Sequence, residues 1–257
     1  MKYWNYDRIA GSYDETRMIP PQLIAFFIKE VQDYLESKFL IPPYNLLSIG
    51  IGTGRIESLL SSKKCQVFGV DIAKEMLKLL NLKSINPPCY PLIADGLSLP
   101  FSKVFQAILL IQIVHLIELY DEFFEQLANI SKVFVVGSAY TETKSHPFYV
   151  KFFQILHENG WNITREDEPK SIDFEQYIRK FDVTVLKKVK TVKNSIANHQ
   201  IYDGIVNKSF SSLWDVDQSI FEESLQQLDD FIIENKIKKD DVYLTTSKVS
   251  LNFIEFS

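Results

Sequence analysis

The sequence is poor in the residues that build disulfide and metal sites. It has 2 cysteines and 4 histidines among 257 residues. Two thiols, Cys65 and Cys89, exclude a disulfide scaffold and a four-cysteine zinc site. No histidine lies at a metal-binding spacing from another histidine or an acid, so we expect no metal. Both cysteines fall at the beginnings of predicted strands, where buried, unreactive thiols are expected.

A long apolar run and an excess of basic residues are also missing. The longest apolar stretch, 107–117, is interrupted by Gln112 and His115 and is shorter than the about 20 residues that span a bilayer. The amino terminus has no apolar signal region. Lys and Arg number 28 against 33 Asp and Glu, whereas nucleic-acid binding needs a basic surface. We expect a cytoplasmic protein without membrane insertion or a nucleic-acid partner.

Short apolar segments alternate with amphipathic ones through the first half of the chain. Strands are predicted over 45–49, 66–70, 89–93, 105–111 and 132–137, with helices over 23–35, 55–63, 73–82 and 118–130. This alternation indicates βαβ units in an α/β, doubly wound, parallel sheet. Ligands of such sheets bind beyond the carboxyl ends of the strands.

The second half is less regular. Helices are predicted over 148–158 and 173–180, a strand over 182–192, mostly helix over 195–237 with a loop at 208–213, and a closing strand over 249–256. No linker separates two domains. We therefore expect one domain over 1–257, whose parts are a core (40–192 and 247–257), an N-terminal cap (1–39) and a helical insertion (about 195–237).

Three predicted strand ends carry residues suited to an adenosine-containing ligand. The first is followed by Gly50, Gly52 and Gly54, and glycine suits a turn that a ligand approaches closely. The dinucleotide fingerprint needs a third glycine where Arg55 stands, which disfavours a pyrophosphate cradle and an NAD-dependent oxidoreductase. Asp71 ends the second strand and can accept both ribose hydroxyls, or it begins the next helix as its N-cap.

The third strand end carries Asp95 and Gly96, where the carboxylate either holds an adenine amine or caps a turn. With these segments in view, the sequence resembles the class I S-adenosylmethionine-dependent methyltransferases, particularly the broad group of type-11-like small-molecule enzymes. The resemblance is carried, over residues 6 to about 137, by YDRIAGSYDETR (6–17), LSIGIGTG (47–54), VFGVDIAKEML (67–77), ADGLSLPF (94–101) and QIVH (112–115).

The resemblance implies a seven-stranded Rossmann-like sheet with an antiparallel last strand, and S-adenosyl-L-methionine as cofactor. It assigns cofactor contacts to Tyr13, Arg17, Gly50, Ile51, Gly52, Thr53, Gly54, Asp71, Ile72, Met76, Asp95, Gly96 and Gln112. Arg17 either pairs with the cofactor carboxylate or is an exposed helix charge. The segment 207–214 resembles part of an insertion that covers the substrate pocket in some of these enzymes.

Two positions depart from the family pattern. The family usually has an acidic residue where Ser48 stands and Asp where Gln106 stands. The Ser48 change leaves open how the cofactor's amino group is held, and carbonyl groups of the glycine turn are one means. These departures motivate a second hypothesis, a non-catalytic protein that binds S-adenosylmethionine or S-adenosylhomocysteine.

Other candidate residues lie outside the cofactor motifs. His115 follows the fourth strand and is either a general base or a hydrogen-bonded structural residue. The other histidines, His146, His157 and His199, are expected at the surface or in loops. Five aromatic residues either line an acceptor pocket or pack in the core: Tyr140, Phe148, Trp161, Phe210 and Trp214. The leading hypothesis is in-line methyl transfer to a small molecule, with secondary metabolism as one setting, by a monomer or homodimer.

Overall fold

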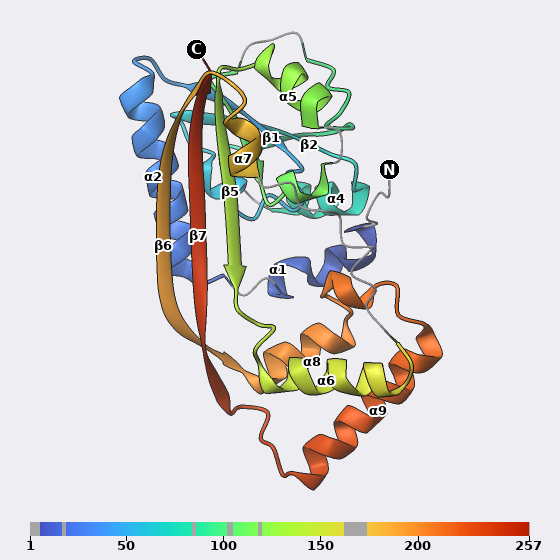
Figure 1. Cartoon of the computed structure of the whole chain (residues 1–257). Coiled ribbons are helices and arrows are strands. Elements are labelled where there is room, and N and C mark those ends of the chain that lie inside the picture. Colours follow the sequence, from blue (N-terminus) through green and yellow to red (C-terminus); the bar gives the residue numbers. More distant parts are fainter. Residues whose placement is uncertain are drawn as a thin grey trace.

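The computed structural model describes residues 6–16, 19–83, 86–101, 105–117, 120–161 and 174–256. At its centre is a seven-stranded sheet with the order β3-β2-β1-β4-β5-β7-β6 (Figure 1). The strands are β1 (Tyr44–Ile49), β2 (Cys65–Asp71), β3 (Tyr90–Ile93), β4 (Ala107–Ile111), β5 (Val133–Thr141), β6 (Val183–Ala197) and β7 (Val242–Phe256). The first five are parallel, and β7 runs antiparallel to both β5 and β6. The predicted Rossmann-like sheet with an antiparallel last strand is confirmed.

Helices bury both faces of this sheet, as its nearly continuous apolar strands require. One face packs against α2 (Pro21–Lys38), α3 (Glu57–Leu60) and α4 (Lys74–Leu82). The other packs against α5 (Tyr120–Ala128) and α7 (Phe174–Ile178). The predicted helix over 55–63 is shorter in the structure because Gly54 and the turn after it precede α3.

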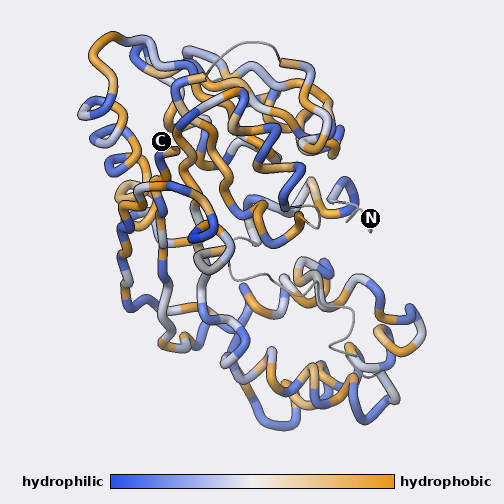
Figure 2. The backbone as a smooth tube through the Cα atoms, turned by 45° about the horizontal axis from the view of Figure 1, so that its top comes forward, coloured by the Kyte–Doolittle hydropathy of each residue, from blue (hydrophilic) through white to orange (hydrophobic). Residues whose placement is uncertain are grey.

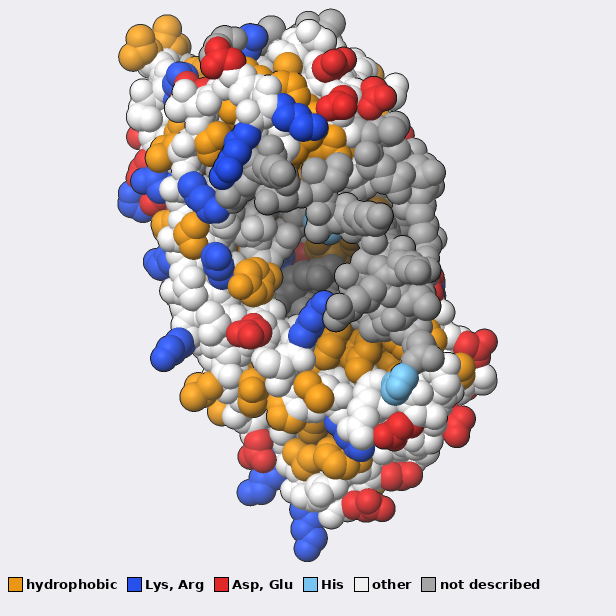
Figure 3. All heavy atoms as spheres, viewed as in Figure 1, with side chains coloured by type: hydrophobic (Ala, Val, Ile, Leu, Met, Phe, Trp, Pro, Cys, Tyr) orange, Lys and Arg blue, Asp and Glu red, His pale blue; other side chains and the backbone are white. Residues whose placement is uncertain are grey.

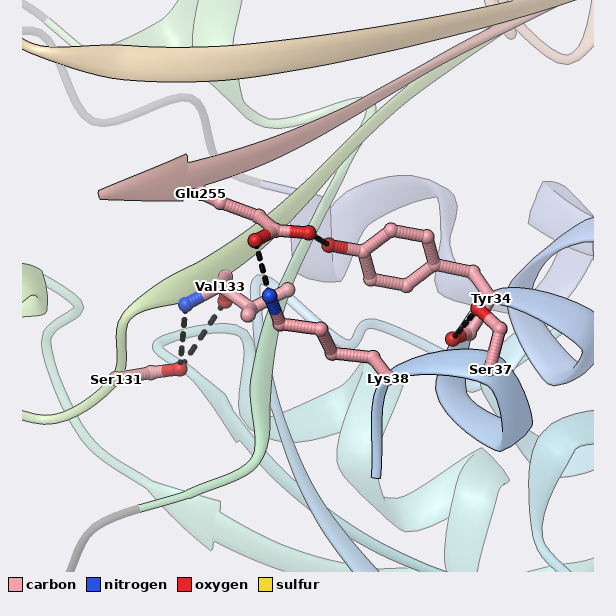
Figure 4. Close-up of polar contacts among 6 residues, drawn as sticks. All are labelled: Tyr34, Ser37, Lys38, Ser131, Val133 and Glu255. Carbon is pink, nitrogen blue, oxygen red and sulfur yellow. Dashed lines mark hydrogen bonds and ion pairs between the residues drawn. The ribbon is translucent and has the colours of Figure 1, made fainter. Parts of the chain in front are cut away.

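A polar cluster fastens the end of α2 to the end of β7 (Figure 4). The Glu255 carboxylate accepts a hydrogen bond from the Tyr34 hydroxyl at 2.6 Å and forms an ion pair with Lys38. These two donors hold the pKa of Glu255 below its usual value, Lys38 contributing most. The Tyr34 ring also stacks on Phe253, so Tyr34 packs into the apolar core between α2 and the sheet.

The last two strands are longer than predicted and run beyond the core (Figure 1). Expected over 182–192 and 249–256, they form an antiparallel ladder in which Val183 pairs with Phe256 and Ala197 pairs with Val242. Polar residues interrupt the apolar pattern in the added part, so the alternation there is too weak to indicate a strand. The helical segment that follows β6 begins at Asn198.

The extended strands carry a second, helical lobe, which Figure 2 shows apart from the sheet. It contains α6 (Pro147–Glu158), α8 (Asn198–Val206), the short turn η4 (Ser211–Leu213) and α9 (Gln218–Glu234). Its helices enclose their own apolar core, in which Phe152, Ile201 and Leu228 are buried. None of the helices in the described part of the chain is long and apolar enough to cross a bilayer.

Lysines line the exposed edge of the sheet. β6 is an edge strand, and Lys187, Lys190 and Lys193 are exposed along it. Figure 3 shows basic side chains on the side of the molecule where β6 lies. Charged side chains on an edge strand oppose pairing with the strands of other molecules, so a strand of this length is tolerated at the edge.

His146 was expected at the surface or in a loop, and the surface placement is wrong. It lies at the N-terminus of α6 and is fully buried, in ring contact with Phe148 and Tyr243. Its Nδ1 accepts the Phe148 N–H at 3.2 Å, so the ring proton is on Nε2, which has no partner among the described residues. Packing against the aromatic rings and the helix-capping bond explain the burial.

Acid is therefore expected to destabilise the lobe through His146. Burial lowers the pKa of His146, so its contribution to folding is present above the unfolded pKa and is lost as the pH falls through the folded value. Asn is a good neutral N-cap, and a cap contributes about 1 kcal/mol. We expect His146→Asn to weaken the fall in free energy of unfolding between pH 7.5 and 5, measured by urea titration. Parallel pH profiles of the two proteins would contradict this.

Candidate functional site: two cavities at the strand ends

Two adjoining cavities lie at the carboxyl ends of β1, β2 and β4. The first holds about 990 Å³ of empty space, its open mouth included, and the second about 1200 Å³. Both are bordered by Gly50, Gly52 and Gln112, so the two cavities meet at the glycine turn. This is the place where the sheet topology predicts a ligand.

The three glycines of the turn have different surroundings, although each has a positive φ, from 54° to 70°. A Cβ on Gly50 would meet the Ile113 side chain at 2.7 Å, and one on Gly54 would meet Leu80 at 2.5 Å. A Cβ on Gly52 would have only the Asp71 carboxylate near it, at 4.0 Å. Gly50 and Gly54 therefore serve close packing, whereas Gly52 presents bare backbone to the cavities.

Asp71 holds this turn from the end of β2. One carboxylate oxygen accepts the Gly52 N–H and the other accepts the Ala73 N–H, each at 2.8 Å. Burial raises the pKa of Asp71, and the backbone donors oppose that shift. The carboxylate also borders the first cavity, so it joins the glycine turn to a ligand there.

The far end of the first cavity is mainly apolar. Ile72, whose side chain is exposed, and Met76 border it from one side. Asp95 and Gly96 follow β3 and border it too, and the Asp95 carboxylate accepts the Leu97 N–H at 2.9 Å. A flat heterocycle with a polar edge suits a slot of this kind.

Gln112 has the backbone conformation of a strained site residue. It follows β4 with a φ of 57°, which is uncommon for a residue other than glycine. Its N–H donates to the Gly137 carbonyl at 2.9 Å, and its side-chain amide donates to the Ala139 carbonyl. These bonds to β5 hold Gln112 at the border of both cavities.

The N-terminal segment crosses the mouth of the site. Tyr6 in η1 (Tyr6–Ser12) and Tyr13 in α1 (Tyr13–Thr16) border both cavities. The next residue, Asp14, accepts a hydrogen bond from the Thr53 hydroxyl at 2.5 Å and pairs with Lys83 at 2.8 Å. Arg17 lies outside the described residues. Asp14 thus connects the N-terminal segment to the glycine turn through a contact that the sequence motifs do not predict.

The second cavity lies between the sheet and the helical lobe. His115 borders it from η2 (Val114–Leu116), Tyr140 and Thr141 from the end of β5, and Phe210 from the lobe. The other aromatic candidates pack elsewhere: Phe148 is buried in the lobe, Trp161 packs against the same core, and Trp214 contacts Tyr6. Ile51 and Thr53 border this cavity, and Gly54 borders neither cavity.

Gln106 and Ser48, the two departures from the family pattern, lie in different surroundings. Gln106 precedes β4, and its side-chain oxygen accepts the Asn45 N–H at 2.7 Å, away from both cavities. Ser48 is fully buried in β1, and its hydroxyl donates to Glu57 at 3.0 Å. The sequence motifs do not single out Glu57. An acidic residue soon after the third glycine, at the start of a helix, could have indicated it as a site residue. Glu57 borders the second cavity.

Comparisons with known proteins agree with this geometry. Residues 47–133 match a family model described as a methyltransferase domain. No curated protein matches the sequence significantly. Among solved structures, YjhP from E. coli superposes with a TM-score of 0.53 and 9% identity, covering 96% of this chain and 99% of that one.

Two further structures have the same fold. A protein of an antibiotic biosynthesis pathway of Anabaena variabilis, assigned as a methyltransferase, gives a TM-score of 0.51 at 14% identity, over 86% of this chain and 96% of that one. The plantazolicin methyltransferase BpumL, solved with a desmethyl substrate analogue and SAH, gives 0.51 at 18%, over 97% and 90%.

The family match indicates a methyltransferase domain, and the sheet order and the position of the site at its strand ends agree with that match. Residues 47–133, from β1 to the start of β5, carry the methyltransferase-domain pattern. The site fits S-adenosylmethionine, the cofactor that the sequence resemblance implies. Gly52 leaves room for a ligand beside a carboxylate, and an apolar slot lies on one side of it.

Proposed function

We propose that this enzyme methylates a small-molecule acceptor, with the adenosine of the cofactor in the first cavity and the acceptor in the second. The observation that carries the proposal is the open face of Gly52, which borders both cavities beside Asp71. When bound, the cofactor supplies a methyl group on a positively charged sulfur. Proximity and alignment of the acceptor then lower the barrier by up to about 7–11 kcal/mol.

The chain's own residues have separate roles in this proposal. Asp71 receives the ribose hydroxyls, Asp95 faces the adenine edge, and Tyr13 covers the site and excludes water. His115 accepts a proton from acceptors that must lose one, because it borders the second cavity and an imidazole titrates near neutrality. The whole chain, 1–257, acts as one cytoplasmic catalytic domain, in which the N-terminal cap and the helical lobe enclose the acceptor.

Calorimetry with S-adenosylmethionine and S-adenosylhomocysteine tests the cofactor site. We expect Asp71→Ala to weaken both ligands by about 100-fold, because it removes a charged acceptor and frees the Gly52 turn. Asp230→Ala, at an exposed carboxylate on α9, is the control and should bind normally. Wild-type protein that binds neither ligand, or an Asp71→Ala variant with unchanged affinity, would contradict the assignment.

An acceptor screen tests the other cavity. The relatives named for antibiotic biosynthesis and for plantazolicin suggest beginning with secondary metabolites, and mass spectrometry detects the added methyl group. Tight cofactor binding without any methylated product would favour a non-catalytic accessory protein. With an acceptor in hand, a His115→Gln variant that keeps the wild-type rate would remove His115 from the role of base.

A further inference from the structure

The Glu57 carboxylate is a buried acid for which the site described so far has no use. Its side chain is 4% exposed and belongs to the first residue of α3. It accepts a hydrogen bond from Ser48, and among the described residues no lysine or arginine pairs with it directly. Burying a carboxylate without a cationic partner is costly, so such a group calls for an explanation.

The position of Glu57 indicates which cation could pair with its carboxylate. Glu57 borders the second cavity together with Gly50, Gly52 and Thr53 of the glycine turn. On the proposed function, the amino-acid part of the cofactor extends from the first cavity over this turn. That part carries a primary ammonium group, which is the kind of cation a desolvated carboxylate binds best.

We propose that Glu57, oriented by the Ser48 hydroxyl, is the anionic subsite for the ammonium group of the cofactor's methionine moiety. The inference rests on the proposed placement of the cofactor. It also accounts for serine at the end of β1: the negative charge comes from α3, and the strand contributes the hydrogen-bond donor that orients it.

The electrostatic surroundings agree with this role. Burial raises the pKa of Glu57 to about 7, while Ser48, nearby backbone N–H groups and Arg55 oppose the shift. Burial, and after it the charge on Glu57, raise the pKa of the Cys89 thiol, and His115 borders the same cavity as Glu57. A bound ammonium group favours the ionised carboxylate, so ligand binding below pH 7 should release a proton from Glu57.

The test compares S-adenosylhomocysteine with its desamino analogue, in which hydrogen replaces the amino group. We expect the wild type to prefer the amino form by about tenfold or more, and Glu57→Gln to reduce that preference to about twofold or less. Glu57→Gln should also abolish the proton release at pH 6, measured calorimetrically in buffers of different ionisation enthalpy. The desamino analogue should bind both proteins alike, which shows that the variant folds.

A double variant separates charge from local structure. Ser48→Asp combined with Glu57→Ala returns a carboxylate to the end of β1 and should recover part of the preference lost in Glu57→Ala alone. A Glu57→Gln variant that keeps the full preference, or that weakens both ligands equally, would overturn the inference. Wild-type protein that binds neither ligand would instead count against the proposed function itself.

Discussion

Replacing Gly52 by valine is expected to abolish binding of S-adenosylmethionine and S-adenosylhomocysteine. The side chain would project into the space beside the Asp71 carboxylate, where nothing else lies within 4 Å of an added Cβ. It would also disturb the 2.8 Å hydrogen bond from the Gly52 N–H to Asp71. We expect a loss of about 1,000-fold or more, equivalent to about 4 kcal/mol, measured by calorimetry.

A matched control separates occupied space from backbone strain. Gly160, after α6, also has a positive φ, 88°, and no atom within 4 Å of an added Cβ. Valine there carries a similar conformational cost of about 1–3 kcal/mol but lies outside both cavities. Gly160→Val should therefore lose stability and keep its affinity. Equal affinity of Gly52→Val and the wild type would show that the turn is purely structural.

The ligand-free protein is expected to become more stable when Glu57 is replaced by Gln. Burial raises the pKa of Glu57 from 4.5 to about 7. The folded state therefore binds the proton more tightly than the unfolded state, and its stability decreases as the pH rises from about 4.5 to 7. Gln is uncharged and can still accept the Ser48 hydrogen bond, so it avoids this loss.

The gain should depend on pH in a defined way. Below pH 4.5 both side chains are neutral and the two proteins should be about equally stable. At pH 8 the variant should have a free energy of unfolding higher by about 3 kcal/mol, since each pKa unit corresponds to about 1.4 kcal/mol. Urea titrations at pH 4 and pH 8 measure this, with Glu223→Gln, exposed on α9, as control. A constant difference across this range would contradict a buried, titrating Glu57.

The Glu57 carboxylate is thus expected to lower the stability of the ligand-free protein and to strengthen ligand binding. The substitution that stabilises the ligand-free protein is the one expected to weaken its hold on the ammonium group. Stability is commonly lost in this way where a binding site holds a group in an environment that is unfavourable until the ligand is bound. It also gives a practical sign of the site, because ordinary surface substitutions change stability by less than about 0.5 kcal/mol.

Much of the cofactor side of the site could be predicted from local sequence. Gly50, Gly52 and Asp95 follow short apolar strands and Asp71 ends one, and parallel strands bring their carboxyl ends to one edge. The motif did not distinguish the glycines, because their neighbours Ile113 and Leu80 are distant in sequence from the turn. The burial of His146 escaped prediction for the same reason, since Tyr243 encloses it from β7.

The sequence by itself determined the alternation of strands and helices, the glycine turn and the acids at the strand ends, because these depend on neighbouring residues and on the period of the apolar pattern. Only the tertiary structure decided that β6 and β7 continue past the core, that the lobe borders a second cavity, and that Glu57 lies against Ser48. The first two features come from pairing and burial between distant segments, whose energy no local pattern records. The third depends on how the glycine turn folds α3 back against β1.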